Sequence, residues 1–288
     1  MRRTALLALC LLSGLLVAGT LGPSPSTGDS GPPAVIADWE GVSTGVGNDA
    51  NTQLLLHFEA DASTAWSDSS LAAHSQPTVS SATRSEVQEK FGDSSALFVS
   101  ASSKYLEWAA HEDWQFGAGD WTVDCWIRPA SFPAAGSSVN VAAHYVDSQN
   151  YTTFQIENNG GTYYLRVRGR DANVVNVDIS EVAAMSADTW YHAEWARSGT
   201  TYYLFLDGTL LGSTVDADSV TSSDGVLRLG TSNPTFAHYD GYLDEFRLTK
   251  GEARHTATFT APTAKYGGLT LWLEDSEGNK YPAQGWVP

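Results

Sequence analysis

The stretch TWYHAEWARSGTTYYLFLDGTLLGS (residues 189–213) consists of aromatic and aliphatic runs separated by short turns. Residues of these types favour β-strands over helices. Asp207-Gly208 lies between YYLFL and TLLGS, and because glycine adopts positive φ without strain, this pair predicts a two-residue β-hairpin. Further along, LDEFR (residues 243–247) predicts a return strand. We expect Trp190 and Trp195 to fill the core of this antiparallel unit.

Alternating segments and turn residues recur along most of the chain. WTVDCWIR (residues 121–128) alternates, which predicts that Trp126 lies on the opposite sheet face from Trp121, Val123, Cys125 and Ile127. The turn NNGG (residues 158–161) separates YTTFQIE from YYLRVR and predicts a second hairpin. A helix is expected only over about residues 85–90. This pattern predicts an all-β sandwich of two antiparallel sheets.

Five phrases in chain order resemble the concanavalin A-like lectin/glucanase (laminin G-like) jelly-roll family. They are LLLHFE (54–59), KFGDSSALF (90–98), WQFGAGDWTVDCWIRP (114–129), the stretch at 189–213, and GYLDEFRLTKGEAR (241–254). Together they cover roughly residues 52–265. The resemblance implies a jelly-roll sandwich of the kind that secreted proteins and phage structural proteins carry.

The chain divides into four parts. Residues 1–19 begin with Met-Arg-Arg and an apolar run, which predicts a signal peptide or another apolar N-terminal segment. Residues 20–51 are rich in Pro, Gly and Ser and predict a linker or an extended arm. Residues 52–265 form the jelly-roll domain, and residues 266–288 predict a short C-terminal β extension, a possible hairpin.

Charge narrows the range of partners. The chain has 33 acidic and 16 basic residues, with a formal net charge of −17. Phosphate backbones require a Lys- and Arg-rich surface, so we expect no nucleic-acid partner. The apolar run at residues 4–18 is shorter than the ~20 residues that a membrane span needs, so membrane contact is expected only through this run, if it is not cleaved. Cys10 and Cys125 offer no disulfide or zinc motif within the domain.

Catalytic signatures are missing from the sequence. Retaining glycosidases need two carboxyl groups about 5–5.5 Å apart, and no acidic cluster here has that spacing on one strand face. Asp244 and Glu245 are adjacent and are expected to point to opposite faces. Neither a Gly-x-Ser-x-Gly elbow nor a His-x-x-x-His pair occurs. We therefore expect a protein that is not an enzyme.

Asp244 is the candidate metal ligand. A carboxylate inside an apolar strand must be paired, hydrogen-bonded or bound to a cation. Arg247, three residues on, is expected on the opposite face and so is not its partner. The resemblance implies a structural Ca²⁺ site that joins Asp244 to Asp61 or Glu59. The alternative is a hydrogen-bonded structural carboxylate.

Tyr164, Arg166 and Arg168, together with a neighbouring Trp126, form the candidate ligand-binding face. Aromatic faces and planar polar groups hold sugars, so this set suits a glycan. It would equally suit the packing of the arm or of a second copy.

Two functions therefore stay open. The first is a non-catalytic, lectin-like structural subunit of an extracellular appendage or virion, such as a tail, fibre or capsid decoration. Its partners would be copies of itself or other appendage proteins, joined through the terminal extensions. The second is a secreted or cell-surface carbohydrate-binding or adhesion module. Both place the protein outside the cell or on a virion surface.

Overall fold

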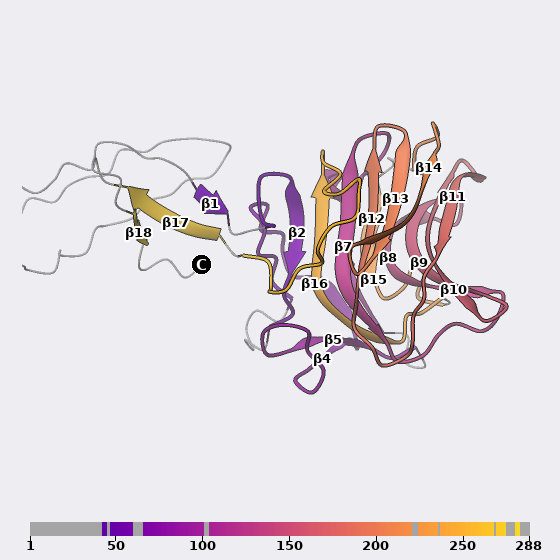
Figure 1. The fold of residues 1–288 in the computed structure, drawn as a ribbon, viewed down its shortest axis with the longest axis horizontal. Helices are drawn as coiled ribbons and strands as arrows, with labels where there is room; N and C mark the ends of the chain where they lie inside the picture. The colour runs from indigo at the N-terminus through magenta and orange to yellow at the C-terminus, as the bar shows by residue number, and fades with distance from the viewer. Residues whose placement is uncertain are drawn as a thin grey trace, which may run out of the picture. The chain divides into compact units, whose positions relative to one another are not determined.

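A computed structural model of the chain describes residues 42–44, 47–59, 66–100, 104–220, 224–235, 237–267, 269–274 and 280–282. Two large antiparallel sheets pack face to face as a sandwich (Figure 1). This arrangement confirms the predicted all-β, concanavalin A-like jelly roll. The one described helical turn is η2 (Glu112–Trp114), and the helix expected over residues 85–90 is wrong, because Ser85 ends a strand and bends follow it.

The first sheet has eight strands in the order β14-β13-β12-β7-β16-β5-β4, with β2 also pairing with β16. Their bounds are β2 (Thr52–Leu56), β4 (Thr83–Ser85), β5 (Ser95–Phe98), β7 (Trp121–Pro129), β12 (Tyr191–Ser198), β13 (Thr201–Leu206), β14 (Thr209–Val215) and β16 (Gly241–Lys250). The predicted hairpin joins β13 to β14, with φ of 49° at Asp207 and 75° at Gly208. A Cβ at Gly208 would lie 2.2 Å from the carbonyl oxygen of Phe259, so this turn requires glycine.

The second sheet has seven strands in the order β11-β10-β9-β8-β15-β6-β3. Their bounds are β3 (Thr78–Ser80), β6 (Tyr105–Trp108), β8 (Ser137–Asp147), β9 (Asn150–Asn159), β10 (Thr162–Asp171), β11 (Val174–Val182) and β15 (Val226–Leu229). The predicted turn at residues 158–161 joins β9 to β10, and Gly160 and Gly161 both have positive φ.

A separate small sheet has three strands, β1 (Val42–Thr44), β17 (Leu269–Glu274) and β18 (Lys280–Pro282). β1 lies in the predicted arm and pairs antiparallel with β17 of the predicted C-terminal extension, Val42 opposite Leu271. The signal or apolar segment and most of the arm lie outside the described residues. Buried Asn48 and Tyr266 show that packing extends beyond residues 52–265 at both ends. No helix in the described part of the chain is long and apolar enough to cross a membrane.

The core lies between the two large sheets and follows the predicted alternation. Trp121, Val123, Cys125 and Ile127 are all buried in it, as is Trp195. Trp190 was predicted to lie in the core, and this prediction is wrong. It is partly exposed and its ring lies 6.5 Å from that of Tyr242. The physical reason is that β12 begins at Tyr191, so Trp190 precedes the alternation of the strand.

A β-bulge in β16 changes the faces expected for three charged residues. Asp244 pairs with Trp126 and Arg247 pairs with Asp124, so β16 has one residue more than β7 over this interval. Glu245 takes a φ of 49° within it. Arg247 therefore lies on the same face as Asp244. Glu245 also reaches that face, where its carboxylate accepts the backbone N–H of Tyr266 at 2.8 Å. The predicted opposition of these residues is wrong.

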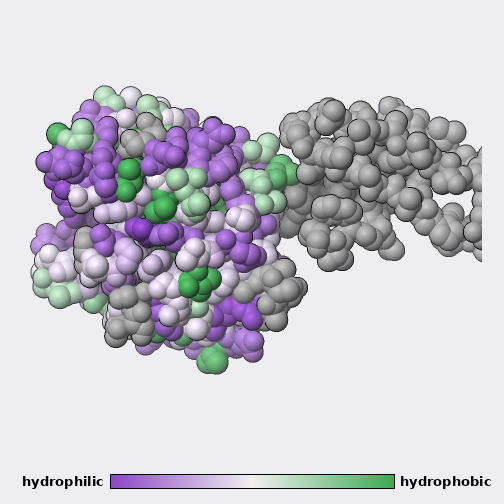
Figure 2. Space-filling view, turned by 180° about the vertical axis from the view of Figure 1, so that it is seen from behind, coloured by the Kyte–Doolittle hydropathy of each residue, from purple (hydrophilic) through white to green (hydrophobic). Residues whose placement is uncertain are grey.

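The surface is mainly hydrophilic. Hydrophobic residues stand singly among polar ones on the face shown in Figure 2. Single exposed apolar side chains are normal on soluble domains, and an obligate interface requires a contiguous patch. The described residues on this face show scattered apolar side chains of that ordinary kind.

Candidate functional site

β10 presents Tyr164, Arg166 and Arg168 on the outer face of the seven-stranded sheet, with Leu165 and Val167 in the core. Trp126 is on β7 of the eight-stranded sheet. The outer faces of two packed sheets point away from each other, so the structure separates Trp126 from the β10 residues. The expectation that they are neighbours is wrong.

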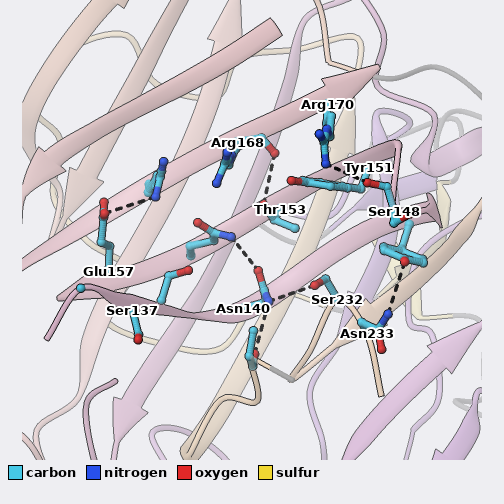
Figure 3. Close-up of a pocket in the computed structure, with 16 residues that line it drawn as sticks. Ser137, Asn140, Ser148, Tyr151, Thr153, Glu157, Arg168, Arg170, Ser232 and Asn233 are labelled. Carbon is cyan, nitrogen blue, oxygen red and sulfur yellow. Dashed lines mark hydrogen bonds and ion pairs between the residues drawn. The ribbon is translucent and has the colours of Figure 1, made fainter. Parts of the chain in front are cut away.

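A groove of about 620 Å³ lies on the outer face of the seven-stranded sheet (Figure 3). Arg166 and Arg168 line it, and Tyr164 is outside the lining. Most of its lining residues carry polar side chains. Its lining residues are Gly136, Ser137, Ser138, Asn140, Tyr145, Ser148, Tyr151, Thr153, Gln155, Glu157, Arg166, Arg168, Arg170, Ser232, Asn233 and Ala237.

Arg166 is neutralised by two carboxylates. Its Nε and Nη2 donate to the two oxygens of Asp178 at 2.5 and 2.6 Å, and Nη1 lies 3.2 Å from Glu157 Oε1. Burial acts to lower the pKa of Arg166, but the hydrogen bonds and charge of Asp178 and the charge of Glu157 outweigh it and raise this pKa. Arg166 is thus a fixed part of the groove wall.

Arg168 and Arg170 keep unused donors. Arg168 Nε is 3.7 Å from Asp178 Oδ2, too long for a hydrogen bond. Arg170 donates to the carbonyl oxygens of Ser148 and Asn173. Within the described residues, the buried Nε atoms of both arginines and Oε1 of Gln155 have no hydrogen-bond partner. Buried polar atoms are almost always satisfied. These three atoms are withdrawn from solvent, so a ligand in the groove would contact the exposed part of Arg168, whose side chain is 34% exposed.

Side-chain amides form a hydrogen-bonded chain among the residues that line the groove. Gln155 Nε2 donates to Asn140 Oδ1 at 2.9 Å, and Asn140 Nδ2 donates to Ser232 Oγ at 3.1 Å. Near one end the rings of Tyr145 and Tyr151 are almost parallel, with centroids 6.4 Å apart. These groups are not among the residues predicted from the sequence. For β9, the alternation of YTTFQIE is a signal that could have found Tyr151 and Gln155.

Trp126 is only 5% exposed. Lys90 Nζ lies 3.7 Å from the centre of its ring, and the Phe91 ring contacts it edge-on. A shallower hollow of about 580 Å³ adjoins these residues and Trp190. Unlike the groove, this hollow is built partly from residues 260–263, which cross the outer face of the eight-stranded sheet.

The two described residues of the predicted calcium site, Asp244 and Glu59, are held by protein groups. Asp244 Oδ2 accepts the backbone N–H groups of Lys90 and Phe91, and Oδ1 accepts that of Glu245. These three N–H groups satisfy the carboxylate within the protein. Burial raises the pKa of Asp244 to about 7, against the lowering effect of these bonds. Glu59 pairs with Lys265 at 3.0 Å. Asp61 lies outside the described residues, and calcium binding stays a prediction.

Comparison with known proteins agrees with the fold. A family model described as the concanavalin A-like lectin/glucanases superfamily matches residues 100–255, more than half of the chain. No match was found among curated protein sequences.

Three solved structures are similar to this chain at low identity. The binding domain of Paraclostridial Mosquitocidal Protein 1 has a TM-score of 0.55 and 14% identity, over 71% of this chain and 50% of that one. Domain 4 of AbnA, a GH43 extracellular arabinanase from Geobacillus stearothermophilus, in complex with arabinotriose, has a TM-score of 0.54 and 12% identity. The match covers 72% of this chain and 95% of that one. The enzymatically active domain of Bacteriophage CBA120 tailspike protein 2 has a TM-score of 0.50 and 12% identity, over 68% of this chain and 33% of that one. This chain thus spans half of the toxin domain and nearly all of the arabinanase domain. Such identities show a shared fold.

Proposed function

Because the chain belongs to the concanavalin A-like lectin/glucanase superfamily, we propose that it is a non-catalytic, lectin-like module that binds a carbohydrate in the groove. The observation that carries this proposal is an open groove lined by Gln155, Arg168 and Arg170, in which the Arg168 side chain is 34% exposed. Sugar hydroxyls both donate and accept, so they match an amide oxygen and guanidinium N–H groups. The faces of Tyr145 and Tyr151 add surfaces for the apolar side of a sugar ring.

The lining of the groove supports binding over hydrolysis. Glu157 is the one carboxylate among the described lining residues, and it is paired with Arg166. Glycoside hydrolysis requires two carboxyl groups about 5–10 Å apart that are free to act as acid and as base or nucleophile. The second carboxylate near Glu157 is Asp178, and both are held by Arg166. The likeness to a domain crystallised with arabinotriose supports a carbohydrate ligand at the level of fold.

The test is an oligosaccharide array probed with the full chain, followed by calorimetry on the strongest hit. Arg168→Ala should weaken binding of that hit by about tenfold or more, since a charge-assisted hydrogen bond contributes about 1.5–3 kcal/mol. Arg128→Ala is the matched control, because Arg128 is on the eight-stranded sheet and pairs with Asp188. An array without any hit, or a hit that Arg168→Ala leaves unchanged, would overturn the proposal.

A structural role in an extracellular appendage or virion is a second proposal. Pairing of β1 with β17 supports it, because strands contributed by both terminal parts are a means of joining copies if exchanged between chains. Likeness to a tailspike domain adds support at the level of fold. Partners would then be copies of the chain or other appendage proteins, on a secreted or virion surface. Light scattering on the full chain and on a chain without residues 21–44 tests it, and a monomer in both cases would contradict it.

A further inference from the structure

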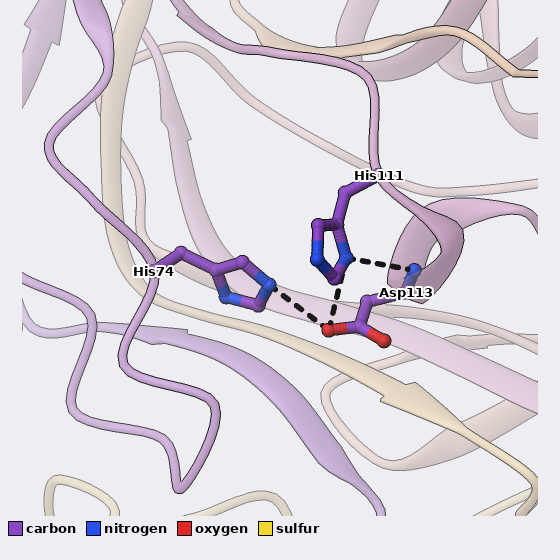
Figure 4. A group of neighbouring side chains, drawn as sticks. All are labelled: His74, His111 and Asp113. Carbon is purple, nitrogen blue, oxygen red and sulfur yellow. Dashed lines mark hydrogen bonds and ion pairs between the residues drawn. The ribbon is translucent and has the colours of Figure 1, made fainter.

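Two histidines and an aspartate from distant parts of the chain converge at one carboxylate oxygen (Figure 4). His74 lies between β2 and β3, while His111 and Asp113 lie at η2. His74 Nε2 is 2.9 Å from Asp113 Oδ2, and His111 Nδ1 is 3.2 Å from the same oxygen. All three ligand atoms lie within 4.8 Å of one another. Two metal–ligand bonds of about 2.0–2.2 Å span at most about 4.4 Å, so one ion can bridge the 2.9 and 3.2 Å separations.

Asp68 fixes the ring of His74 from the other side. Its Oδ2 lies 2.8 Å from His74 Nδ1. Asp68 is itself held by the backbone N–H groups of Leu55, Ser70 and His74. A carboxylate on the far nitrogen of a histidine orients the ring and raises the basicity of the near nitrogen, as it does around protein-bound metals. The Nε2 atom of His74 is thereby aimed at the cluster.

His111 Nδ1 lies 3.2 Å from both the backbone nitrogen and Oδ2 of Asp113. Its lone pair accepts the backbone N–H of Asp113 at the start of η2, so a bound ion would replace this hydrogen bond. Unprotonated imidazole nitrogen is the form that ligates metals.

The cluster packs against a buried tryptophan on one side and is exposed to solvent on the other. The buried ring of Trp114 lies 5.0 Å from the ring of His74 and 5.3 Å from that of His111. The side chains of His74 and Asp113 are 10% and 19% exposed, and that of His111 is 46% exposed. An ion could therefore enter from solvent and keep water on its outer side.

We propose that His74, His111 and Asp113 bind a divalent transition-metal ion, with Zn²⁺ as the best match. Imidazole ligands select zinc-type ions, whereas calcium takes oxygen ligands. Three protein ligands leave further coordination positions for water or for an oxygen of a bound molecule. The ion would tie the segment between β2 and β3 to η2, at the edge where β3 pairs with β6. This proposal is independent of carbohydrate binding in the groove.

Calorimetric titration of the full chain with ZnCl₂, after chelator treatment and without a polyhistidine tag, tests the site. We expect one Zn²⁺ per chain and a loss of affinity of about tenfold or more in both His111→Ala and Asp113→Asn. His238→Ala is the matched control, since His238 lies outside the cluster and should leave affinity unchanged. Because His111 is nearly half exposed, its variant should fold, and circular dichroism without metal verifies this.

Substitution by Co²⁺ gives a second measurement. Its visible absorption reports coordination by imidazole and carboxylate directly, and its binding should quench the fluorescence of Trp114. Absence of zinc binding, unchanged affinity in His111→Ala and Asp113→Asn, or equally tight binding of Ca²⁺ would each overturn the proposal.

Discussion

The outer faces of the two sheets start from the same alternating pattern and end differently. On the seven-stranded sheet, β8, β9 and β10 leave their polar side chains around an open groove. On the eight-stranded sheet, Asp124, Glu194 and Arg247 occupy equivalent alternate positions and are 0–3% exposed. Polar alternation alone therefore does not identify a binding surface.

Residues 251–266 make the difference, because they cross the outer face of the eight-stranded sheet. His255 pairs with Glu194 at 2.9 Å, Phe259 donates its backbone N–H to Gly208, and the Tyr266 hydroxyl donates to Asp124. The charges on the covered face pair with one another, as Arg247 does with Asp124 and His255 with Glu194. Among the described residues, buried polar atoms without a partner occur on both faces, at Trp126 and His192 on the covered one and at Gln155, Arg168 and Arg170 in the groove. Coverage, and with it the supply of partners from the chain itself, separates a structural face from a candidate binding face.

Among the substitutions on the covered face, Arg247→Ala should lower the free energy of unfolding most. Its Nε donates to Asp124 at 2.9 Å, and both side chains are almost fully buried. Loss of one partner leaves an unpaired buried charge, so we expect the free energy of unfolding to fall by about 3–5 kcal/mol. Urea denaturation measures it. A loss below about 1 kcal/mol would contradict the view that this face is sealed.

Gly208→Ala should destabilise the same face by about 2 kcal/mol. The glycine has positive φ, and an added Cβ would meet the backbone of Phe259 at 2.2 Å, so the covering segment must move. Thermal unfolding gives the stability change. Gly160→Ala is the control, because Gly160 also has positive φ but its Cβ would meet open space, so its loss should be smaller.

Acid should weaken the covered face. The hydrogen bond and charge of Arg254 lower the pKa of Asp49 to about 2, and the charge of Arg247 holds the pKa of buried Asp124 well below its usual range despite desolvation. A depressed native pKa means that the unfolded state binds more protons. This stability is therefore present above about pH 4 and is lost as the pH falls toward 2.

Asp49→Asn tests this account of acid lability. Asp49 is more than a third exposed, so solvent screening limits the expected loss at neutral pH to about 1 kcal/mol. The variant should also show a shallower decline in stability between pH 4 and 2, measured by urea unfolding at each pH. An unchanged pH profile would show that Arg254 does not stabilise the ionised form.

Arg168→Ala should have the smallest effect on stability, below about 0.5 kcal/mol, because its side chain is 34% exposed and its contact with Asp178 is long. The same substitution carries the largest expected effect on carbohydrate binding. Stability and binding should thus separate on the open face. A large loss of stability would mean that Arg168 is structural.

Much of the fold could be predicted from local patterns. The alternation in β7 and the glycine turns after β9 and β13 are local, since side-chain direction and positive φ depend on neighbouring residues. The bulge at Glu245 could not be predicted from the sequence, because it depends on the register of β16 with β7. That bulge moved Arg247 to the face of Asp244.

Only part of the candidate site could be predicted. Arg166 and Arg168 were found because they alternate on one strand. Asn140 and Ser232 belong to the groove through pairing between distant strands, which a single sequence does not display. Trp126 was predicted on the wrong sheet, because alternation shows that its side chain faces away from the core but does not show to which of the two sheets its strand belongs.

By itself, the sequence determined the all-β class, the jelly-roll family and the acidic character of the protein, because these depend on composition and on spacing along the chain. Only the tertiary structure decided which polar face is covered, and only it brought His74 to within 2.9 Å of Asp113, 39 positions away. Both outcomes depend on contacts between segments far apart in the chain. Such contacts follow from how the sheets close on each other and leave no periodic trace in the sequence.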